Sequence, residues 1–398
     1  MCSQPATSPE NSVLPAFGGV SVFEHRWTLF NLFGFGVRVD LSWLILALLV
    51  TWSLAKGLFP HQYPELSVAT YWLMGILGAL GLFVSIVFHE FCHSLVARRY
   101  GLPMKGITLF VFGGIAEMGE EPRTPKIEFL MAAAGPVASF LLALLFYLVW
   151  TLGNNLAWSD LANGITGYLA FINVLLAVFN LLPAFPLDGG RILRSALWQW
   201  QGDLRRATRS ASRIGAGFGV ALMLFGLFNA FGGNLIGGLW YFLIGLFLRG
   251  AARMTYQQLL LRLAFEGQSI THLMNPAPVQ VSPDISLREL IEDHLPRHLG
   301  KTFPVVEQGW LIGCAPLARI KQFRREDWAE HQVREILQPC PETTLIKPDA
   351  DVLQALAHMQ KLNLKHLLVV DDQKLLGTLA LADILSAYAA WMELESET

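Results

Sequence analysis

Two long stretches with almost no charge constrain this chain more than any other feature. Residues 214–248 hold no charged residue, and residues 129–185 hold one, Asp160. A helix needs roughly 20 apolar residues to cross about 30 Å of hydrocarbon, so both stretches are long enough to span a bilayer. Charged residues make up only 15% of the chain, against about 25% in soluble domains. The sequence therefore excludes a single soluble domain and predicts a multi-pass membrane protein.

Six transmembrane helices are expected, followed by a soluble tail. Residues 214–248 are too long for one span and short for two, and the Gly232-Gly233-Asn234 turn near their middle favours a hairpin of two spans. Residues 270–398 have the charge content of a soluble domain. The other four spans are expected at residues 41–59, 68–88, 129–152 and 165–185.

Lys and Arg residues are concentrated on one side of these spans. Thirteen of them lie beside the span ends on one side of the membrane, whereas one, Lys56, lies beside the span ends on the other side. Cytoplasmic loops carry an excess of Lys and Arg, so both termini and the tail are expected in the cytoplasm. The thirteen are Arg26, Arg38, Arg98, Arg99, Lys105, Arg123, Lys126, Arg191, Arg194, Arg205, Arg206, Arg209 and Arg213.

Charge and cysteine content exclude several other classes of protein. The net charge of −2 gives no reason to expect nucleic acid as a partner. The four cysteines do not have the paired spacing of a disulfide scaffold. The first 25 residues do not have the basic-then-apolar layout of a cleaved signal peptide.

The second expected span ends in an H-E-x-x-H sequence, His89-Glu90-Phe91-Cys92-His93. On a helix, residues i and i+4 lie on one face, so both imidazoles can reach one metal ion and Glu90 can hold the water that completes the site. Ionisable residues in a membrane span are costly, which indicates function. The alternative is a polar helix end at the membrane surface. Cys92 is interpreted as a packing residue.

A catalytic zinc site with two His ligands needs a third protein ligand and one open position. Residues 180–191 read N-L-L-P-A-F-P-L-D-G-G-R and follow the fourth span. The charge bias places this end on the same membrane face as His89 and His93. The two prolines break the helix and the glycine pair lets the backbone turn sharply, which aims Asp188 at the site. The alternative is a tight turn that leaves the membrane.

The two motifs together resemble those of the site-2 proteases, which are zinc intramembrane metalloproteases, and in particular the bacterial branch with C-terminal cystathionine-β-synthase-type (CBS) repeats. The family pairs H-E-x-x-H with a later N-x-x-P-x-x-P-L-D-G, and both are intact within residues 27–194. The resemblance implies that His89, His93 and Asp188 bind one zinc ion, that Glu90 is the general base, and that Asn180 lies beside the substrate backbone.

Three further segments are interpreted with the family in view. Residues 105–116 are rich in strand-forming residues and too short to be a span, so we expect a re-entrant strand whose edge pairs with an unwound substrate, with Gly113 and Gly114 as substrate-binding residues. A membrane-surface loop is the alternative. Residues 30–43 are expected to form a similar hairpin, although Asp40-Leu41 replaces the family's His-Pro. The small residues at 132–136 are interpreted as helix packing near the site.

The tail contains an internal repeat. Phe303-Pro304-Val305-Val306 matches Leu367-Leu368-Val369-Val370, and Leu311-Ile312-Gly313 matches Leu375-Leu376-Gly377, with an offset of 64 residues in both. This period resembles that of a tandem CBS pair. The expected domains are an N-terminal cytoplasmic tail at residues 1–26, the transmembrane protease domain at 27–263, and CBS repeats at 270–325 and 333–390.

CBS pairs often bind adenine nucleotides through a Gly-x-x-Thr/Ser-x-x-Asp pattern. The second repeat keeps only the acid of that pattern, Asp383, and the first repeat has Arg319 at the equivalent position. The tail is therefore predicted either to bind an adenine nucleotide weakly at Asp383 or only to dimerise the protein.

Three functions are compared. The first is a zinc-dependent intramembrane endopeptidase that cleaves a transmembrane substrate near the cytoplasmic side of the bilayer, with regulation by the tail. The second is an inactive relative that binds membrane partners, which the complete set of ligands and base argues against. The third is a transporter or channel, whose internal symmetry is not found in residues 1–250. The resemblance implies the bacterial plasma membrane and a single-pass substrate: an anti-sigma factor, a membrane-tethered factor or a signal-peptide remnant.

Overall fold

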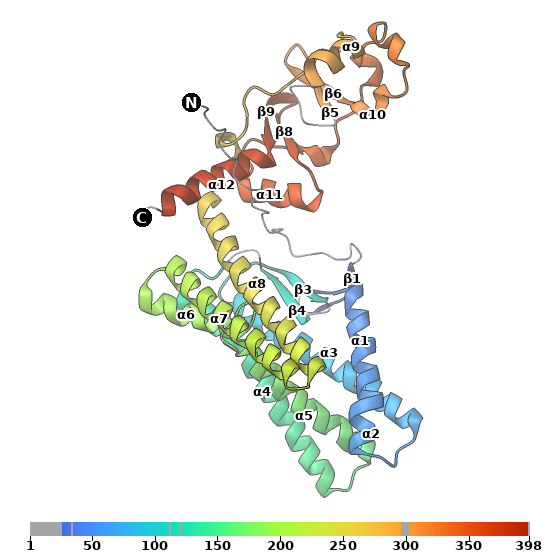
Figure 1. The fold of residues 1–398 in the computed structure, drawn as a ribbon, viewed down its shortest axis with the longest axis vertical. Coiled ribbons are helices and arrows are strands. Elements are labelled where there is room, and N and C mark those ends of the chain that lie inside the picture. Colours follow the sequence, from blue (N-terminus) through green and yellow to red (C-terminus); the bar gives the residue numbers. More distant parts are fainter. Residues whose placement is uncertain (1–25, 33–34, 111–112, 119–120, 296–301, 397–398) are drawn as a thin grey trace, which may run out of the picture. The chain divides into compact units, whose positions relative to one another are not determined.

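The computed structural model describes residues 26–32, 35–110, 113–118, 121–295 and 302–396. The chain divides into two compact units, which we call the helical unit (up to Leu259) and the tail unit (from Leu260). Each is described by itself (Figure 1). The predicted N-terminal tail lies outside the described residues except for Arg26.

The described part of the chain contains six helices long and apolar enough to cross a membrane, as predicted. The first of them joins three consecutive elements, and a short amphipathic helix separates the fourth from the fifth. The elements are α1 (Leu41–Ser53), η1 (Leu54–Leu58), α2 (Phe59–Gln62), α3 (Val68–Arg99), α4 (Pro125–Asn155), α5 (Asp160–Asn180), α6 (Asp188–Gln201), α7 (Leu204–Phe231) and α8 (Leu235–Phe265).

Local sequence signals decide where these helices begin and end. The side chains of Ser67, Thr124 and Ser159 each accept a hydrogen bond from the first turn of α3, α4 and α5, respectively. Helix α5 ends at Asn180, earlier than the predicted residue 185, because the proline-containing segment that follows cannot continue it. Apolar content alone does not detect this break.

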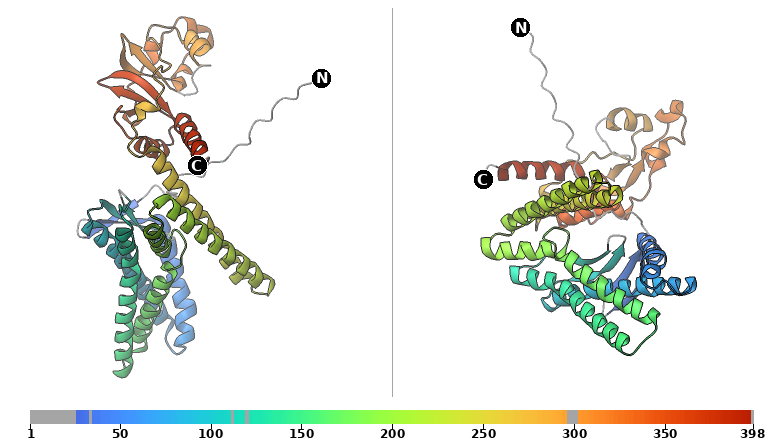
Figure 2. Two further views of the ribbon diagram at one scale, coloured as in Figure 1. Left: turned by 90° about the vertical axis from the view of Figure 1, so that its left-hand side faces the viewer. Right: turned by 60° about the horizontal axis from the view of Figure 1, so that its bottom comes forward.

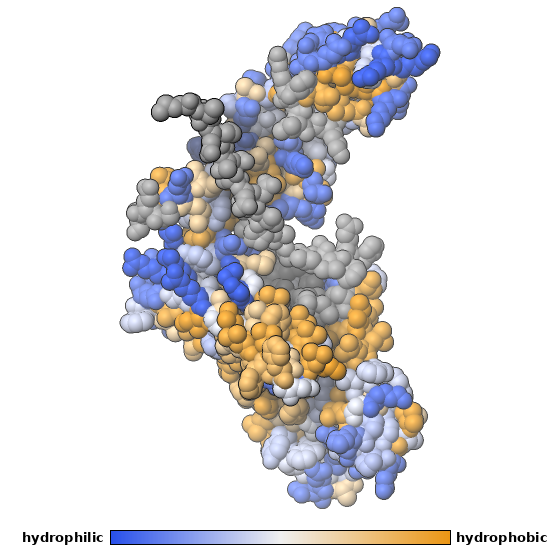
Figure 3. Space-filling view, in the orientation of Figure 1, coloured by the Kyte–Doolittle hydropathy of each residue, from blue (hydrophilic) through white to orange (hydrophobic). Residues whose placement is uncertain are grey.

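The last two spans form the predicted hairpin. Their backbones pack closely at two glycine pairs, since a Cβ atom on Gly226 would lie 2.6 Å from the Gly238 carbonyl oxygen and one on Gly219 would lie 2.6 Å from that of Gly245. Figure 3 shows apolar side chains over α7 and α8 on the face in view. Figures 1 and 2 show α4 and α5 side by side along their length.

A four-stranded sheet with order β1-β2-β3-β4 packs beside α3. Its strands are β1 (Arg26–Leu32), β2 (Phe35–Asp40), β3 (Met104–Phe110) and β4 (Gly113–Met118). The N-terminal hairpin lies at residues 26–40 instead of 30–43, and the expected single strand at 105–116 is a second hairpin. Val37 and Val39 of β2 are buried against Val87 and Phe91 of α3, which flank His89.

The tail unit is a mixed five-stranded sheet with order β5-β6-β9-β8-β7 and short helices. Hairpins β5–β6 and β8–β9 have the same register and a bulge at the same place, offset by 64 residues, as the predicted repeat requires. The elements are η2 (Ile270–His272), α9 (Leu287–Glu289), η3 (Leu290–His294), β5 (Thr302–Glu307), β6 (Trp310–Pro316), α10 (Leu317–Ile320), η5 (Arg325–Ala329), η6 (Val333–Ile336), η7 (Glu342–Thr344), β7 (Leu345–Ile346), α11 (Val352–Lys361), β8 (His366–Asp371), β9 (Lys374–Ala380) and α12 (Leu381–Ser396).

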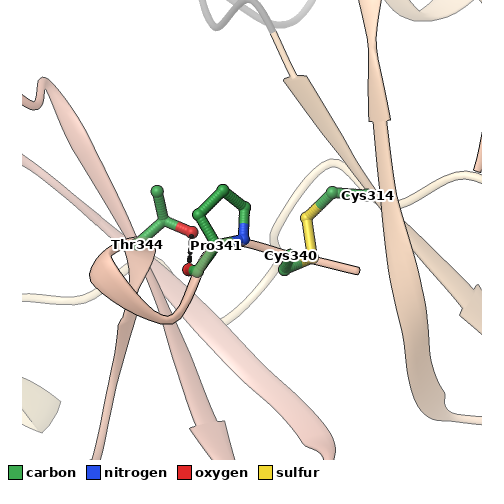
Figure 4. The surroundings of a disulfide bond; sticks show 4 residues. All are labelled: Cys314, Cys340, Pro341 and Thr344. Atoms are coloured by element: carbon green, nitrogen blue, oxygen red, sulfur yellow. Dashed lines mark hydrogen bonds between the residues drawn. A yellow bond between two sulfur atoms is a disulfide. The ribbon is translucent and has the colours of Figure 1, made fainter. Parts of the chain in front are cut away.

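A disulfide joins Cys314 of β6, in the first predicted repeat, to Cys340, near the start of the second (Figure 4). Cys340 is followed by Pro341, whose carbonyl accepts a hydrogen bond from the Thr344 hydroxyl at 2.7 Å. The cysteine spacing did not indicate this bond, because the two residues belong to different repeats and meet only through tertiary structure.

Reduction of this disulfide is expected to destabilise the tail unit by about 2–4 kcal/mol, because a crosslink between distant residues restricts the unfolded chain. The two cysteines are 26 residues apart. Urea-dependent proteolysis of the tail in the detergent-purified protein, with and without a thiol reductant, measures the effect. Cys340→Ser should abolish the difference and Cys92→Ser, at the free cysteine, should preserve it. Equal stability in both redox states would contradict the prediction.

Candidate metal centre

The structure brings three of the predicted site residues together. His89 and His93 lie one turn apart on α3, only 3% and 8% exposed, with ring centroids 4.8 Å apart. Asp188 is the first residue of α6, and its Oδ2 atom lies 3.1 Å from His89 Nε2 and 3.2 Å from His93 Nε2. The three ligand atoms all lie within 4.8 Å of one another, so they can contact a single metal ion.

Two glycines allow the Asp188 carboxylate to approach the imidazoles. A Cβ atom on Gly190 would lie 2.7 Å from backbone atoms of Ala184 and Phe185, and one on Gly189 would meet the Leu181 and Leu182 carbonyls. The turn before α6 therefore closes only without side chains at these positions.

Electrostatics favour the ionised form of Asp188. Burial acts to raise the pKa of its carboxyl, but the hydrogen bonds that the His89 and His93 imidazoles donate when they are protonated outweigh burial, so this pKa lies below its usual range. The ionised carboxylate is the form that binds a cation.

Helix α4 orients both imidazoles without contributing a ligand itself. His93 Nδ1 donates to the Met131 carbonyl oxygen at 2.6 Å, and His89 Nδ1 lies 2.8 Å from the Ser139 hydroxyl oxygen. Because a carbonyl can only accept, the proton of neutral His93 is on Nδ1 and the lone pair is on Nε2, which faces Asp188. Such partners fix the tautomer and ring orientation of metal-binding histidines.

The space between the two Nε2 atoms is bounded by Gly135 of α4. A Cβ atom there would lie 2.5 Å from His89 Nε2 and closer still to that of His93. Any side chain at this position would fill the place where a shared ion would sit. The donor set and this open position both fit a zinc ion, which takes His nitrogen and carboxylate oxygen ligands.

The other predicted site residues of the helical unit lie on three different elements. Glu90 follows His89 in α3 and is half-buried. Asn180 is the last residue of α5, and its amide nitrogen donates to the Leu176 carbonyl at 3.0 Å. Gly113 and Gly114 begin β4 and pair with the end of β3.

Two remaining predictions concern residues outside the cluster. Cys92 is half-buried on α3 and does not belong to the cluster of candidate ligands. Asp383 lies in the tail unit in the first turn of α12, where its Oδ2 accepts a hydrogen bond from the Ala380 N–H at 3.0 Å.

The sequence interpretation missed the role of α4. Residues 132–136 were interpreted as packing, whereas Met131, Gly135 and Ser139 contact the imidazoles directly. Their spacing of four residues places them on one helix face, which is a signal that the sequence does carry. Which helix that face contacts depends on tertiary packing.

Comparisons with known proteins find relatives of this chain. Residues 77–157 and 151–226 match peptidase family M50, and residues 333–390 match the CBS domain. The "Putative zinc metalloprotease sll0528" of Synechocystis sp. is 33% identical over 361 residues, which are 89% of this chain and 93% of that protein. Zinc metalloprotease MJ0392 of Methanocaldococcus jannaschii is 33% identical over 321 residues, 79% of this chain and 86% of that protein. The solved site-2 protease from Methanocaldococcus jannaschii is 28% identical, covering 57% of this chain and 94% of its own, with a TM-score of 0.39.

Proposed function

The chain belongs to peptidase family M50, the site-2 proteases, and on this premise we propose that His89, His93 and Asp188 hold one zinc ion at which a transmembrane protein is cleaved. The protein is an integral membrane zinc metalloendopeptidase with a C-terminal CBS domain. The observation that carries the ligand assignment is the convergence of three ligand atoms from α3 and α6 within 4.8 Å. The space kept open by Gly135 supports it.

Glu90 acts as the general base in this proposal. Zinc bound at such a site lowers the pKa of water and offsets negative charge on a carbonyl oxygen. Glu90 takes a proton from the attacking water and passes it to the departing amine nitrogen. Its position directly after His89 supports this role, because it places Glu90 on the helix that carries both proposed histidine ligands.

The substrate backbone is bound in extended form. Strand β4 is one of the two outer strands of the described sheet, and an outer strand presents backbone N–H and C=O groups to one side. Gly113 and Gly114 then pair with the substrate beside α3, which carries His89. The Asn180 amide nitrogen donates one hydrogen bond to the Leu176 carbonyl, and we assign the amide oxygen to the substrate.

The substrate is a single-pass protein such as an anti-sigma factor, a membrane-tethered factor or a signal-peptide remnant, cut near the cytoplasmic side of a bacterial plasma membrane. The distribution of Lys and Arg supports this orientation, with both termini and the tail unit in the cytoplasm. Cytosolic reductants keep thiols reduced, so in this orientation the reduced form of Cys314 and Cys340 is expected in growing cells.

The tail unit regulates the protease, either as a dimerisation module or by binding an adenine nucleotide at Asp383. One observation disfavours a nucleotide in the first repeat. The Gln338 amide oxygen, turned toward Arg319, accepts hydrogen bonds from Arg319 Nε and Nη2 at 2.6 Å. Calorimetry of the purified full chain tests the second repeat: heat that Asp383→Ala removes would support a nucleotide site, and no heat at millimolar ATP or AMP would contradict it.

Zinc content of the detergent-purified protein tests the ligand assignment. We expect about one zinc per chain in the wild type and clearly less in Asp188→Ala, because two imidazoles alone do not complete the site. Atomic emission measures the metal, and size-exclusion chromatography shows that both proteins are folded. Equal zinc in both would contradict the role of Asp188, and no zinc in folded wild type would contradict the proposed function.

A further inference from the structure

A buried ion pair joins α4 to α6, the helix that begins at Asp188. Arg194 Nε donates to Glu128 Oε1 at 2.6 Å, Nη2 contacts the same oxygen, and Nη1 lies 3.8 Å from Glu121 Oε2. Arg194 is 4% exposed and Glu128 0% exposed. The second Glu128 oxygen, Oε2, is also buried and has no hydrogen-bond partner among the described residues.

Such a pair is costly to bury, because desolvation of two charges offsets most of their attraction. It therefore adds little to the stability of the fold but holds two elements in one geometry. Arg194 also lies over the Phe185 ring, 5.6 Å from its centroid. Phe185 belongs to the turn that precedes Asp188, so one guanidinium contacts both α4 and the segment that carries the proposed ligand.

The pair belongs to a single face of α4. At 3.6 residues per turn, Glu128, Met131, Gly135 and Ser139 fall within an arc of about 80°. Met131 and Ser139 orient the two imidazoles, and Gly135 keeps the space between them. Glu128 extends this face by one turn toward α6.

We propose that Glu128 and Arg194 are a positioning pair that fixes α6 against α4, so that the Asp188 carboxylate reaches both Nε2 atoms. The inference rests on the proposed function, since it assigns the pair a role through a proposed zinc ligand. It also makes α4 the element that sets the position of all three ligands.

Zinc affinity of the full-length protein tests the pair. We expect Glu128→Gln and Arg194→Gln each to weaken zinc binding about 10- to 100-fold, the range for residues that orient metal ligands. The double variant leaves no buried unpaired charge. Its zinc affinity should be at least that of whichever single variant has the lower affinity, because the two residues act through each other. Competition with a chelator measures the affinity.

Cobalt substitution gives a readout that a purely structural role would not change. The absorption spectrum of bound Co²⁺ depends on coordination geometry, so a displaced Asp188 carboxylate should alter it in the folded double variant. Arg262→Gln is the matched control: it removes an exposed ion pair with Glu266 and should leave affinity and spectrum unchanged.

The outcomes separate this inference from the proposed function. Wild-type affinity and spectrum in the folded double variant would overturn the positioning role, even if Asp188→Ala loses zinc as expected. If the single variants fail to fold, the double variant decides alone. If the double variant also fails to fold, Phe185→Leu provides the test, because it replaces the ring that lies under Arg194. Unchanged zinc affinity and an unchanged Co²⁺ spectrum in Phe185→Leu would overturn the positioning role. Folded wild type without zinc would overturn both proposals.

Discussion

Glu90→Gln is expected to abolish cleavage while the protein keeps its zinc. Gln has the same shape as Glu but cannot accept a proton, and loss of a positioned general base lowers rates by about 10²- to 10⁴-fold. Because Glu90 does not belong to the ligand cluster, the metal content should stay near that of the wild type. Cleavage of a tagged single-pass membrane protein in detergent, with zinc measured on the same sample, gives both quantities.

Cys92→Ser is the matched control for this prediction, because Cys92 lies on the same helix close to Glu90 and outside the cluster. Its cleavage rate should stay within a few-fold of the wild type. A Glu90→Gln protein that contains zinc and cleaves at the wild-type rate would show that another group takes the proton.

Gly135→Ala is expected to eliminate zinc binding. The added Cβ would lie 2.5 Å from His89 Nε2 and closer to that of His93, in the place of the shared ion. In a helix interior, Ala is more favourable than Gly by about 0.5–1 kcal/mol, which offsets part of the cost of the contact between the new Cβ atom and the imidazoles. Zinc content and thermal unfolding of the purified variant measure the two effects.

Gly217→Ala provides the comparison. Gly217 lies inside α7, and a Cβ atom there would meet nothing within 4 Å. This variant should bind zinc as the wild type does. If Gly135→Ala also bound zinc normally, the ion would have to lie elsewhere than between the two Nε2 atoms.

The sequence predicted the elements and the cluster because each has a short-range signal. Six spans follow from apolar length, and His89 and His93 come to one face through helical periodicity alone. The prediction that Asp188 joins the two histidines required one long-range inference. It came from the distribution of Lys and Arg, which places the loop that carries Asp188 on the same membrane face as His89 and His93. The offset of 64 residues in the tail recurs in the strand registers.

The features that the sequence did not reveal all depend on contacts between distant elements. Nothing near Ser139 indicates that its hydroxyl faces His89, 50 residues earlier. Glu128 and Arg194 are ordinary charges near helix ends until α4 and α6 pack together. Cys314 and Cys340 likewise meet only through tertiary structure. The prolines after residue 180 predict the break, but the span assigned from apolar content runs on to residue 185, past the end of α5 at Asn180.

The separation of the proposed ligands along the chain has a consequence for biosynthesis. His89 and Asp188 are 99 residues apart, and chains are made at about 5–20 residues per second, so the third ligand follows the first by about 5–20 s. During that interval α3 can be in the membrane with both imidazoles in place, but without the carboxylate. The nascent chain therefore cannot act on neighbouring membrane proteins until α6 has been synthesised and has docked against α4.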